Sequence, residues 1–473
     1  MLFNSVEFLF VFLPITFFVY FLLNKAKLIN LATAWLVVAS LAFYSYWKID
    51  YLPLILISMV FNYSIGSTIS HENKLKINKK TLFLVGIVGN IGLLIYYKYI
   101  DFLISNINTI FSAEFNYMNI VLPLAISFFT FQQIAYLVDS FEGKTKEYDF
   151  LRYALFVTFF PQLIAGPIVH HKEMMPQFEN LRNRFINPKN ISLGMFLLAI
   201  GLFKKVVIAD FLSPYVAQIF DVISKPTFFE AWIGAFSYTF QLYFDFSGYT
   251  DMAMGIGYLF NIVLPQNFNS PLKAISIQDF WRRWHMTLSR FLRDYIYIPL
   301  GGNRLSERKT YRNLFLTFLI GGIWHGANWT FIIWGICHGL AMCIHRFWVK
   351  TQRFVIPNFC ASSLTFFFVV LTFLIFRTHT VERAYELYKS LIGLNGFAPV
   401  MYDKFRLSFE GGSLKISLFL IIGVIIMTFF MKNSTEWAKN FKPTKLYFIL
   451  TIVMLISALL NLNRISEFLY FQF

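Results

Sequence analysis

The chain has 473 residues, of which 57% are hydrophobic, 20% are aromatic and only 14% are charged. Soluble domains average about 25% charged residues, so this composition excludes an ordinary soluble enzyme and predicts a polytopic helical membrane protein. The formal net charge of +16 comes from Lys and Arg residues in short segments between apolar runs. That distribution is typical of cytoplasmic loops and argues against nucleic acid as a partner.

Apolar runs long enough to cross a bilayer recur from one end of the chain to the other. Regular runs predict spans at 6–24, 31–47, 51–69, 81–97, 120–138, 192–209, 230–245, 363–376, 414–431 and 446–462. Less regular runs at 101–113, 151–168, 247–264 and 311–348 contain Gly, Pro and polar residues, and they predict broken or re-entrant helices shielded from lipid. We expect one domain over 1–473 with about 11–13 spans.

The basic residues between the first spans predict the orientation. Lys25 and Lys27 follow the first run, and Lys74, Lys76, Lys79 and Lys80 follow the third. Loops rich in Lys and Arg face the cytoplasm, so we expect the N-terminus outside. The first run lacks the basic start and the cleavage site of a signal peptide, so we expect it to be retained as a span.

The stretch 276–295 combines an aromatic face with basic residues. Ser276 and Asp279 have the spacing of a helix capping box. At helical spacing one face would hold Trp281, Trp284, His285, Leu288, Leu292 and Tyr295, and another would hold Arg283, Thr287, Arg290 and Asp294. This pattern predicts one amphipathic helix at the cytoplasmic interface, with His285 pointing into the protein.

A basic loop follows this stretch. Arg304, Arg308, Lys309 and Arg312 come after a Gly301-Gly302 pair. One interpretation is a loop held inside by its charge. The other is a site that attracts the phosphates of an acyl donor, because Arg and Lys bind phosphate well. The sequence has no Walker motif and no dinucleotide fingerprint.

His325 is an ionisable residue inside an apolar run, flanked by Gly321, Gly322, Trp324 and Gly326. If Arg312 marks the inner boundary, the intervening helix is about 16 Å long at 1.5 Å per residue, which places His325 near the middle of a core about 30 Å thick. Alternatives are a hydrogen-bonded core histidine and a proton relay in a transporter. The second Trp-His pair at His285 favours acid–base chemistry.

The other candidate side chains predict packing rather than chemistry. His338 and His345 are seven residues apart and therefore share a helix face. Cys337, Cys343 and Cys360 have no metal-ligand spacing and are too few for a disulfide framework. We therefore expect no metal site and no tightly bound cofactor.

Several motifs together are highly specific. They are Met1-Leu2-Phe3-Asn4-Ser5, the stretch Leu122 to Gln132, the stretch Phe160 to Ile168, Gly201-Leu202-Phe203-Lys204-Lys205, the stretch Asp245 to Asp251, the stretch Phe280 to Ser289, and the stretch Gly322 to Trp329. On these motifs the chain resembles the membrane-bound O-acyltransferases and, among them, the bacterial alginate O-acetylation protein subfamily. The resemblance covers almost the whole chain.

The resemblance implies a helical bundle around a central funnel, formed by N-terminal spans (1–115), a core (120–350) and C-terminal spans (360–473). It implies that His325 is the catalytic histidine and that His285 is the second polar catalytic position. Gln132, Gln162, Trp284, Trp324 and Asn328 would line the tunnel. The carboxylates of Asp245 and Asp251 need partners in apolar surroundings, and Arg282 or Arg283 could supply them.

The implied activity is transfer of an acetyl group from a cytoplasmic donor, acetyl-CoA, across the membrane to an exopolysaccharide or a cell-wall polysaccharide. The outer segment 378–413 is too short for a polysaccharide-binding domain, and the resembled family passes the group to a separate extracytoplasmic acetyltransferase, so we expect such a partner. One alternative is a D-alanyl transferase acting on teichoic acid. Another is a transporter without bond-making, which the lack of an internal repeat disfavours.

Overall fold

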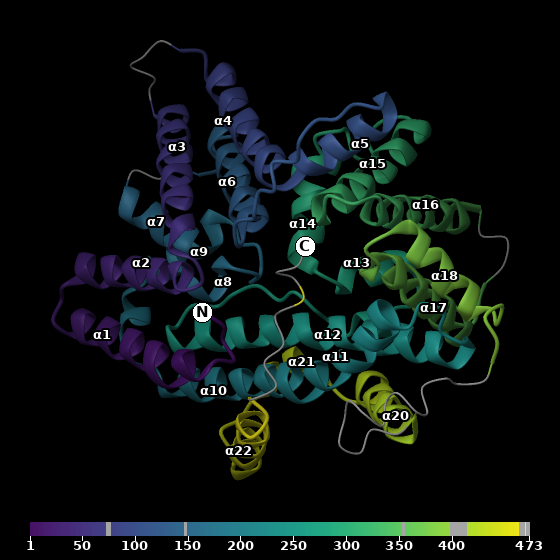
Figure 1. The fold of residues 1–473 in the computed structure, drawn as a ribbon. Coiled ribbons are helices and arrows are strands. Elements are labelled where there is room, and N and C mark those ends of the chain that lie inside the picture. The colour runs from purple at the N-terminus through teal and green to yellow at the C-terminus, as the bar shows by residue number, and fades with distance from the viewer. Residues whose placement is uncertain (72–76, 146–148, 352–354, 398–413, 463–468, 470–473) are drawn as a thin grey trace. The chain divides into compact units, whose positions relative to one another are not determined.

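The computed structural model describes residues 1–71, 77–145, 149–351, 355–397, 414–462 and 469 (Figure 1). All regular secondary structure in these ranges is helical, which confirms the predicted all-helical class. Lys74 and Lys76, and residues 398–413 of the expected outer segment, lie outside the described residues.

The chain divides into two compact units, each assembled from separate stretches of sequence. Unit 1 comprises residues 1–202, 249–266 and 441–456, and unit 2 comprises 203–248, 267–440 and 457–473. Both candidate catalytic histidines belong to unit 2.

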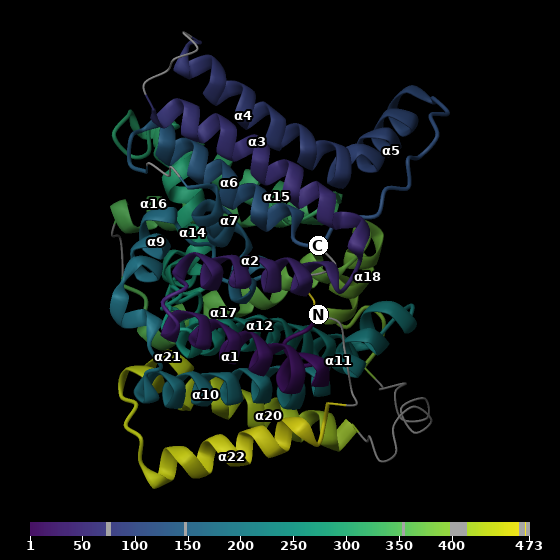
Figure 2. The ribbon, with the colours of Figure 1, turned by 90° about the vertical axis from the view of Figure 1, so that its left-hand side faces the viewer.

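Unit 1 is built mainly from the N-terminal helices. They are a π-helical turn at Phe8–Phe12, α1 (Leu13–Lys25), α2 (Ile29–Ser45), α3 (Leu52–Ser70), α4 (Lys79–Leu94), α5 (Ile100–Phe111), α6 (Ile126–Phe141), α7 (Phe150–Thr158), α8 (Phe160–Leu163), α9 (His171–Glu179), α10 (Pro188–Leu202) and most of α22 (Lys445–Leu459). Within this unit α1 packs on α2, α2 packs on α7, and both α3 and α4 pack on α6 (Figure 2). The backbones at Gly194 of α10 and at Gly255 approach closely because position 194 has no Cβ. A Cβ there would lie 2.7 Å from the carbonyl oxygen of Gly255.

Unit 2 contains the helices that carry the candidate site. They are α11 (Asp210–Ala217), the first part of α12 (Phe228–Leu259), α13 (Ile277–Arg283), α14 (Met286–Leu292), α15 (Glu307–His325), α16 (Trp329–Thr351), α17 (Asn358–Arg377), α18 (Val381–Leu391), α20 (Leu414–Phe430) and α21 (Ser434–Lys439), with π-helical turns at Phe203–Ala209, Gln218–Val222 and Arg293–Tyr297. Helix α16 packs against α13, α15 and α17.

Helices α15 and α16 form a close hairpin. A Cβ on Gly322 would lie 2.8 Å from the Cα atom of Gly335, and a Cβ on Gly335 would lie 2.8 Å from the carbonyl oxygen of Phe318. Backbones can approach this closely only where both helices carry glycine. Gly321 and Gly322 thus leave the helix unbroken, and Gly322 serves close packing.

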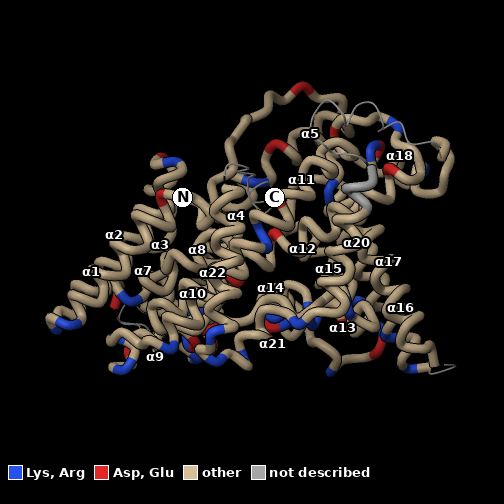
Figure 3. The backbone as a smooth tube through the Cα atoms, turned by 90° about the horizontal axis from the view of Figure 1, so that it is seen from below, with Lys and Arg blue, Asp and Glu red and all other residues tan. Residues whose placement is uncertain are grey.

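The helices have the length and composition of membrane spans. Six in the described part of the chain meet both criteria, at Phe8–Lys25, Ile49–Ser70, Lys79–Phe111, Pro188–Val222, Trp329–Thr351 and Asn358–Arg377. Shorter apolar helices occupy Ile29–Ser45, Phe419–Phe430 and Lys445–Leu459. Charged residues are sparse along these elements (Figure 3). The chain is a multi-pass membrane protein.

The predicted helix breaks are correct in two regions and wrong in two. Phe159 separates α7 from α8, and residues 326–328 separate α15 from α16. In contrast, residues 101–111 continue the helix of α4 through a π-helical turn at Ile95–Tyr99. The expected span 230–245 and most of the less regular run 247–264 form one helix, α12 (Phe228–Leu259), because isolated glycines weaken a helix without interrupting its hydrogen bonds.

Candidate active site

His325 is the last residue of α15, and three aromatic rings pack against its side chain. Its side chain is buried, and its ring centroid lies 5.0 Å from that of Trp324 and 5.1 Å from those of Trp334 and Phe376. The Trp334 and Phe376 rings stand nearly perpendicular to the imidazole, at 87° and 80°. Such edge-to-face packing fixes the plane of the imidazole while keeping bulk water away.

The turn after His325 is held by two specific features. A Cβ on Gly326 would lie 2.2 Å from Cε2 of Phe331, so the packing of this ring requires glycine. Asn328 accepts a hydrogen bond from the Thr330 amide at 3.0 Å and donates one to the His379 carbonyl at 2.6 Å. Asn328 therefore caps α16 and fixes the end of α15.

His285 lies between two short helices, so the expected continuous amphipathic helix over 276–295 is wrong. Helix α13 ends at Arg283 and α14 begins at Met286, with His285 in the left-handed conformation at φ 42°. Periodicity could not reveal this break because its cause is a distant residue. The Asn267 side chain accepts from the Thr287 amide at 3.1 Å, and its carbonyl accepts from the Met286 amide at 2.9 Å.

The same asparagine defines the tautomer of His285. Since the Thr287 amide can only donate, the atom that receives it is the Asn267 amide oxygen. The Nδ1 atom of His285 lies 3.1 Å from this oxygen and must carry the proton. The neutral ring then presents a lone pair on Nε2. His285 lies outside the candidate spans and is fully buried, and this burial lowers its pKa to about 3.

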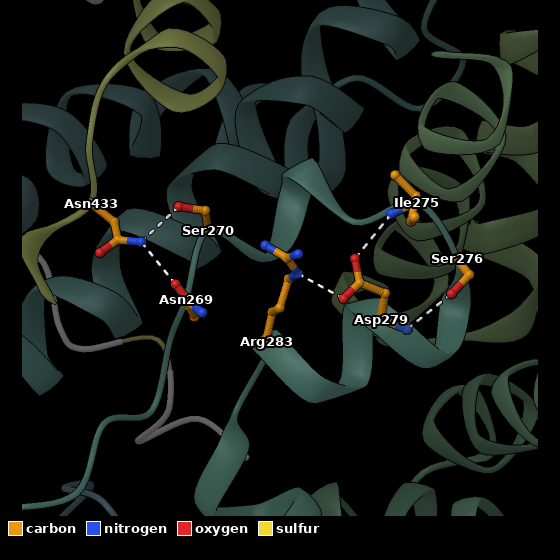
Figure 4. Close-up of polar contacts among 7 residues, drawn as sticks. All are labelled: Asn269, Ser270, Ile275, Ser276, Asp279, Arg283 and Asn433. Atoms are coloured by element: carbon orange, nitrogen blue, oxygen red, sulfur yellow. Dashed lines mark hydrogen bonds and ion pairs between the residues drawn. The ribbon is translucent and has the colours of Figure 1, made fainter. Parts of the chain in front are cut away.

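The segments on both sides of Asn267 and His285 are anchored by polar contacts (Figure 4). Ser276 accepts from the Asp279 amide at 3.1 Å, which confirms half of the predicted capping box, whereas the Asp279 carboxylate accepts from the Ile275 amide instead. Arg283 pairs with Asp279 at 2.8 Å. Asn433 donates to the side chains of Asn269 and Ser270 at 3.0 and 2.9 Å.

Aromatic side chains connect the two histidines within unit 2. Phe246 of α12 stands perpendicular to the His285 ring at 4.8 Å, and Trp284 lies 5.1 Å from Phe373 of α17. Phe373 in turn lies 6.4 Å from Phe376, which contacts His325. Trp284 and Trp324 are both buried in this assembly. Their role in lining a tunnel stays a prediction.

The two histidines expected to pack differ in their surroundings. His338 of α16 is fully buried and has a hydrogen-bond partner on each ring nitrogen. His345 is half-buried on the same helix. Sequence reasoning missed the polar partners of His338, because they come from helices far away in the chain.

A second missed feature is a buried ion cluster on α11, α12 and the π-helical turn before α11. The Lys205 ammonium lies 2.7 Å from both the Asp210 and the Asp245 carboxylates, and all three residues are buried. The expected partners of Asp245, Arg282 or Arg283, are wrong: Arg283 pairs with Asp279. The available signal was Lys205 within an apolar run, five residues before Asp210.

The basic loop is exposed. Arg304, Arg308, Lys309 and Arg312 are all exposed, and Asn313 donates to the Leu300 and Gly302 carbonyls to fix the preceding turn. Lys350 forms a hydrogen bond of 2.5 Å with Glu307, which holds the pKa of that carboxyl below its usual value. Glu307 is thus paired with Lys350 rather than with a basic residue of the loop, and the loop keeps its excess positive charge. Donor binding by this loop stays a prediction.

Gln132 and Gln162 belong to unit 1. Both are buried, and both donate to the carbonyl oxygen of Phe156 at 2.8 Å. This shared acceptor gives each amide group a structural task at the break between α7 and α8. Whether they also line a tunnel stays a prediction.

Comparison with known proteins agrees with this architecture. The profile of the MBOAT, membrane-bound O-acyltransferase family matches residues 140–380. The chain is 45% identical to the peptidoglycan O-acetyltransferase of Helicobacter pylori, with 100% of this chain and 98% of that protein covered. It is 38% identical to the probable alginate O-acetylase AlgI of Pseudomonas aeruginosa, over 91% of this chain and 81% of that protein.

A more distant similarity reaches the teichoic acid D-alanyltransferase of Bacillus subtilis. That protein is 30% identical over 54% of this chain and 69% of its own length. The chain belongs to the membrane-bound O-acyltransferase family. It is an enzyme, an O-acyltransferase of the subfamily that includes the alginate O-acetylases.

Proposed function

We propose that this protein transfers an acetyl group from cytoplasmic acetyl-CoA across the inner membrane, for O-acetylation of an envelope polysaccharide. Similarity over nearly the full length of both chains to a peptidoglycan O-acetyltransferase favours peptidoglycan as the acceptor. The observation that carries the catalytic assignment is the buried His325 imidazole, held at the end of α15 between Trp324, Trp334 and Phe376.

The transfer step needs a base near neutral pH, and an imidazole meets this need. His325 takes the proton of the acceptor hydroxyl while the oxygen attacks the thioester carbonyl. The new carbon–oxygen bond forms and the carbon–sulfur bond breaks. The proton then passes from the imidazolium to the leaving thiolate, which restores the neutral ring. No net charge is left in the apolar site after the cycle.

His285 has a complementary role in this proposal. With its Nδ1 proton committed to Asn267, its Nε2 lone pair can accept a hydrogen bond from a hydroxyl and cannot donate one to an oxyanion. His285 would therefore orient the hydroxyl that His325 deprotonates. Positive φ at a non-glycine residue carries a cost in strain, which is a common feature of functional positions.

The orientation follows from the positive-inside rule, with Lys25 and Lys27 inside and the N-terminus outside. The acetyl group then reaches the outer face of the membrane. We propose that a separate extracytoplasmic acetyltransferase receives it there and modifies the polymer. This partner would dock over the outer opening of the tunnel.

Reconstituted liposomes with acetyl-CoA enclosed would test the proposal. We expect slow acetylation of external polysaccharide by the purified chain alone, and a clear increase when the partner is added outside. Efficient polymer acetylation without a partner would make this chain the complete enzyme and contradict the relay. Transfer from a D-alanyl carrier protein, with none from acetyl-CoA, would instead support the teichoic acid reaction of the Bacillus subtilis relative.

A further inference from the structure

We infer that His338 is a positioning residue for both candidate catalytic segments: directed hydrogen bonds hold it between α13 and α17, and its ring packs against Trp334, which contacts His325. The inference rests on the proposed roles of His325 and His285. His338 lies in α16, 13 residues beyond His325 in the sequence, and it is completely buried. Its two ring nitrogens link α16 to α13 and to α17.

The direction of each hydrogen bond is determined by its donor. The Trp281 indole can only donate, and its Nε1 atom lies 3.1 Å from Nδ1 of His338. Nδ1 is therefore the acceptor, and the single proton of the neutral ring is on Nε2. That proton is donated to the Thr372 hydroxyl at 3.1 Å. The hydroxyl of Thr372 then donates to backbone carbonyls of α17, at 3.0 Å for Phe368.

This arrangement allows only one protonation state. A proton on Nδ1 would face the indole N–H, so two donors would compete at one contact. In a buried site an unmatched donor is destabilising, because it loses its hydrogen bond to water without gaining another. His338 is thus held neutral, with the proton on Nε2, by partners that cannot exchange roles.

The contacts of His338 extend to both candidate catalytic segments. Trp281 lies in α13, one helical turn before His285. On its other side His338 packs against Trp334, with ring centroids 4.5 Å apart, and Trp334 stands perpendicular to His325 at 5.1 Å. A shift of His338 would therefore move the support of His325 and release the helix that leads into His285.

Isosteric variants with matched controls test the inference. Trp281→Phe removes the donor, and Thr372→Val removes the acceptor. Trp232→Phe also loses one indole hydrogen bond, to the Leu391 carbonyl at 3.2 Å. Thr365→Val also loses a bond to the carbonyl four residues earlier in α17. Kinetics of acetyl transfer and thermal unfolding would be measured for all four variants.

We expect Trp281→Phe and Thr372→Val to lower kcat by roughly 10- to 100-fold with little change in the KM for acetyl-CoA, because catalytic groups displaced by about 1 Å lose that much rate. The two controls should keep kcat within about twofold at a similar loss of thermal stability. The double variant should lose less than the product of the two single losses, since both act through His338.

A third variant tests the hydrogen-bond pattern itself. In His338→Gln the amide oxygen can accept from Trp281 and the amide nitrogen can donate to Thr372, so it should retain more kcat than His338→Leu. Equal kcat for Trp281→Phe and Trp232→Phe, or equal losses for Gln and Leu at position 338, would overturn the inference. His325→Ala separates the two questions, because its full activity would instead reject the proposed function.

Discussion

Unit 2 keeps ionisable side chains away from water in two contrasting ways. In the cluster of Lys205, Asp210 and Asp245, one ammonium lies 2.7 Å from each of two carboxylates. His325 is instead packed among aromatic rings, and His285 packs against Phe246 and has a defined neutral tautomer. Charged groups in an apolar interior need opposite charges beside them, whereas a neutral imidazole can be buried at lower cost.

The difference between the two regions indicates that the ion cluster contributes to stability and the histidines to chemistry. In the ion cluster both carboxylates are paired with the same buried ammonium, so we assign the cluster to the structure of α11 and α12. An imidazole whose surroundings leave it neutral can still take up a proton transiently. Substitutions in the two regions should accordingly have opposite profiles, one losing folded protein and the other losing rate.

The largest effect is expected at His325. His325→Ala should lower acetyl transfer by about 10²–10⁴-fold, because it removes the group that we propose as the general base. The amount of folded protein in the membrane should change little. His345→Ala, on α16 and half-buried, is the matched control and should stay active. Normal O-acetylation by a stably expressed His325→Ala variant would reject the catalytic assignment.

The ion cluster should respond in the opposite manner. Lys205→Met leaves two buried carboxylates without their cation and should cost about 3–5 kcal/mol in the free energy of unfolding. Lys204→Met, at the neighbouring half-buried position, removes a side chain that donates to the Ser434 hydroxyl, and it should cost no more than about 1 kcal/mol. Denaturant unfolding in detergent would measure both.

Adding Asp245→Asn to Lys205→Met should recover part of the lost stability, since one unpaired charge is then removed. A Lys205→Met protein as stable as Lys204→Met, but inactive, would show that the cluster belongs to the chemistry. The contrast between the two regions would then be wrong.

Much of the fold was accessible from the sequence because apolar runs report spans directly. The ends of the helices at Phe8–Lys25, Ile49–Ser70 and Asn358–Arg377 lie one to five residues from those of the predicted runs. The errors arose where tertiary contacts override local pattern. Helix α12 continues through residue 248 although glycine suggested a break, and the stretch 276–295 breaks at His285 although its period suggested one helix.

The site could be predicted in part for the same reason. His325 and Trp324 stood out as polar and aromatic residues in an apolar run, and glycines marked the close hairpin. The partners of His285 and His338 could not be found, because Asn267 and Thr372 are ordinary residues whose importance comes from where the fold places them. Likewise, Asp245 could have paired with any nearby cation, and only the structure identifies Lys205.

A smaller effect than at His325 is expected at His285. His285→Gln should lower kcat by roughly 10- to 100-fold, because the variant loses orientation of the hydroxyl and keeps the base. Burial lowers the pKa of His285 to about 3, so this ring stays neutral from pH 5 to 8. The variant should therefore show the same acidic limb as the wild type in a pH–rate profile. If the acidic limb of the pH–rate profile is absent in His285→Gln, His285 rather than His325 is the general base.

The smallest effect is expected at the surface, in the basic loop. Arg308 and Lys309 are exposed, and Glu307 already pairs with Lys350. The proposed attraction between this loop and an anionic donor would therefore act across solvent. Exposed charges of this kind contribute up to about 1 kcal/mol each. Arg308→Gln with Lys309→Gln should therefore raise the KM for acetyl-CoA about threefold to tenfold, leaving kcat unchanged.

The effect on KM should shrink as salt is added, because the Debye length falls from about 30 Å at 0.01 M to about 8 Å at 0.15 M. Lys25→Gln with Lys27→Gln removes the same charge from another exposed loop that we expect to face the cytoplasm. Equal KM changes in the two pairs would indicate a general field rather than a donor site. An unchanged KM with altered topology would assign the loop to orientation of the chain alone, because a loop that only fixes topology leaves the donor's binding energy untouched.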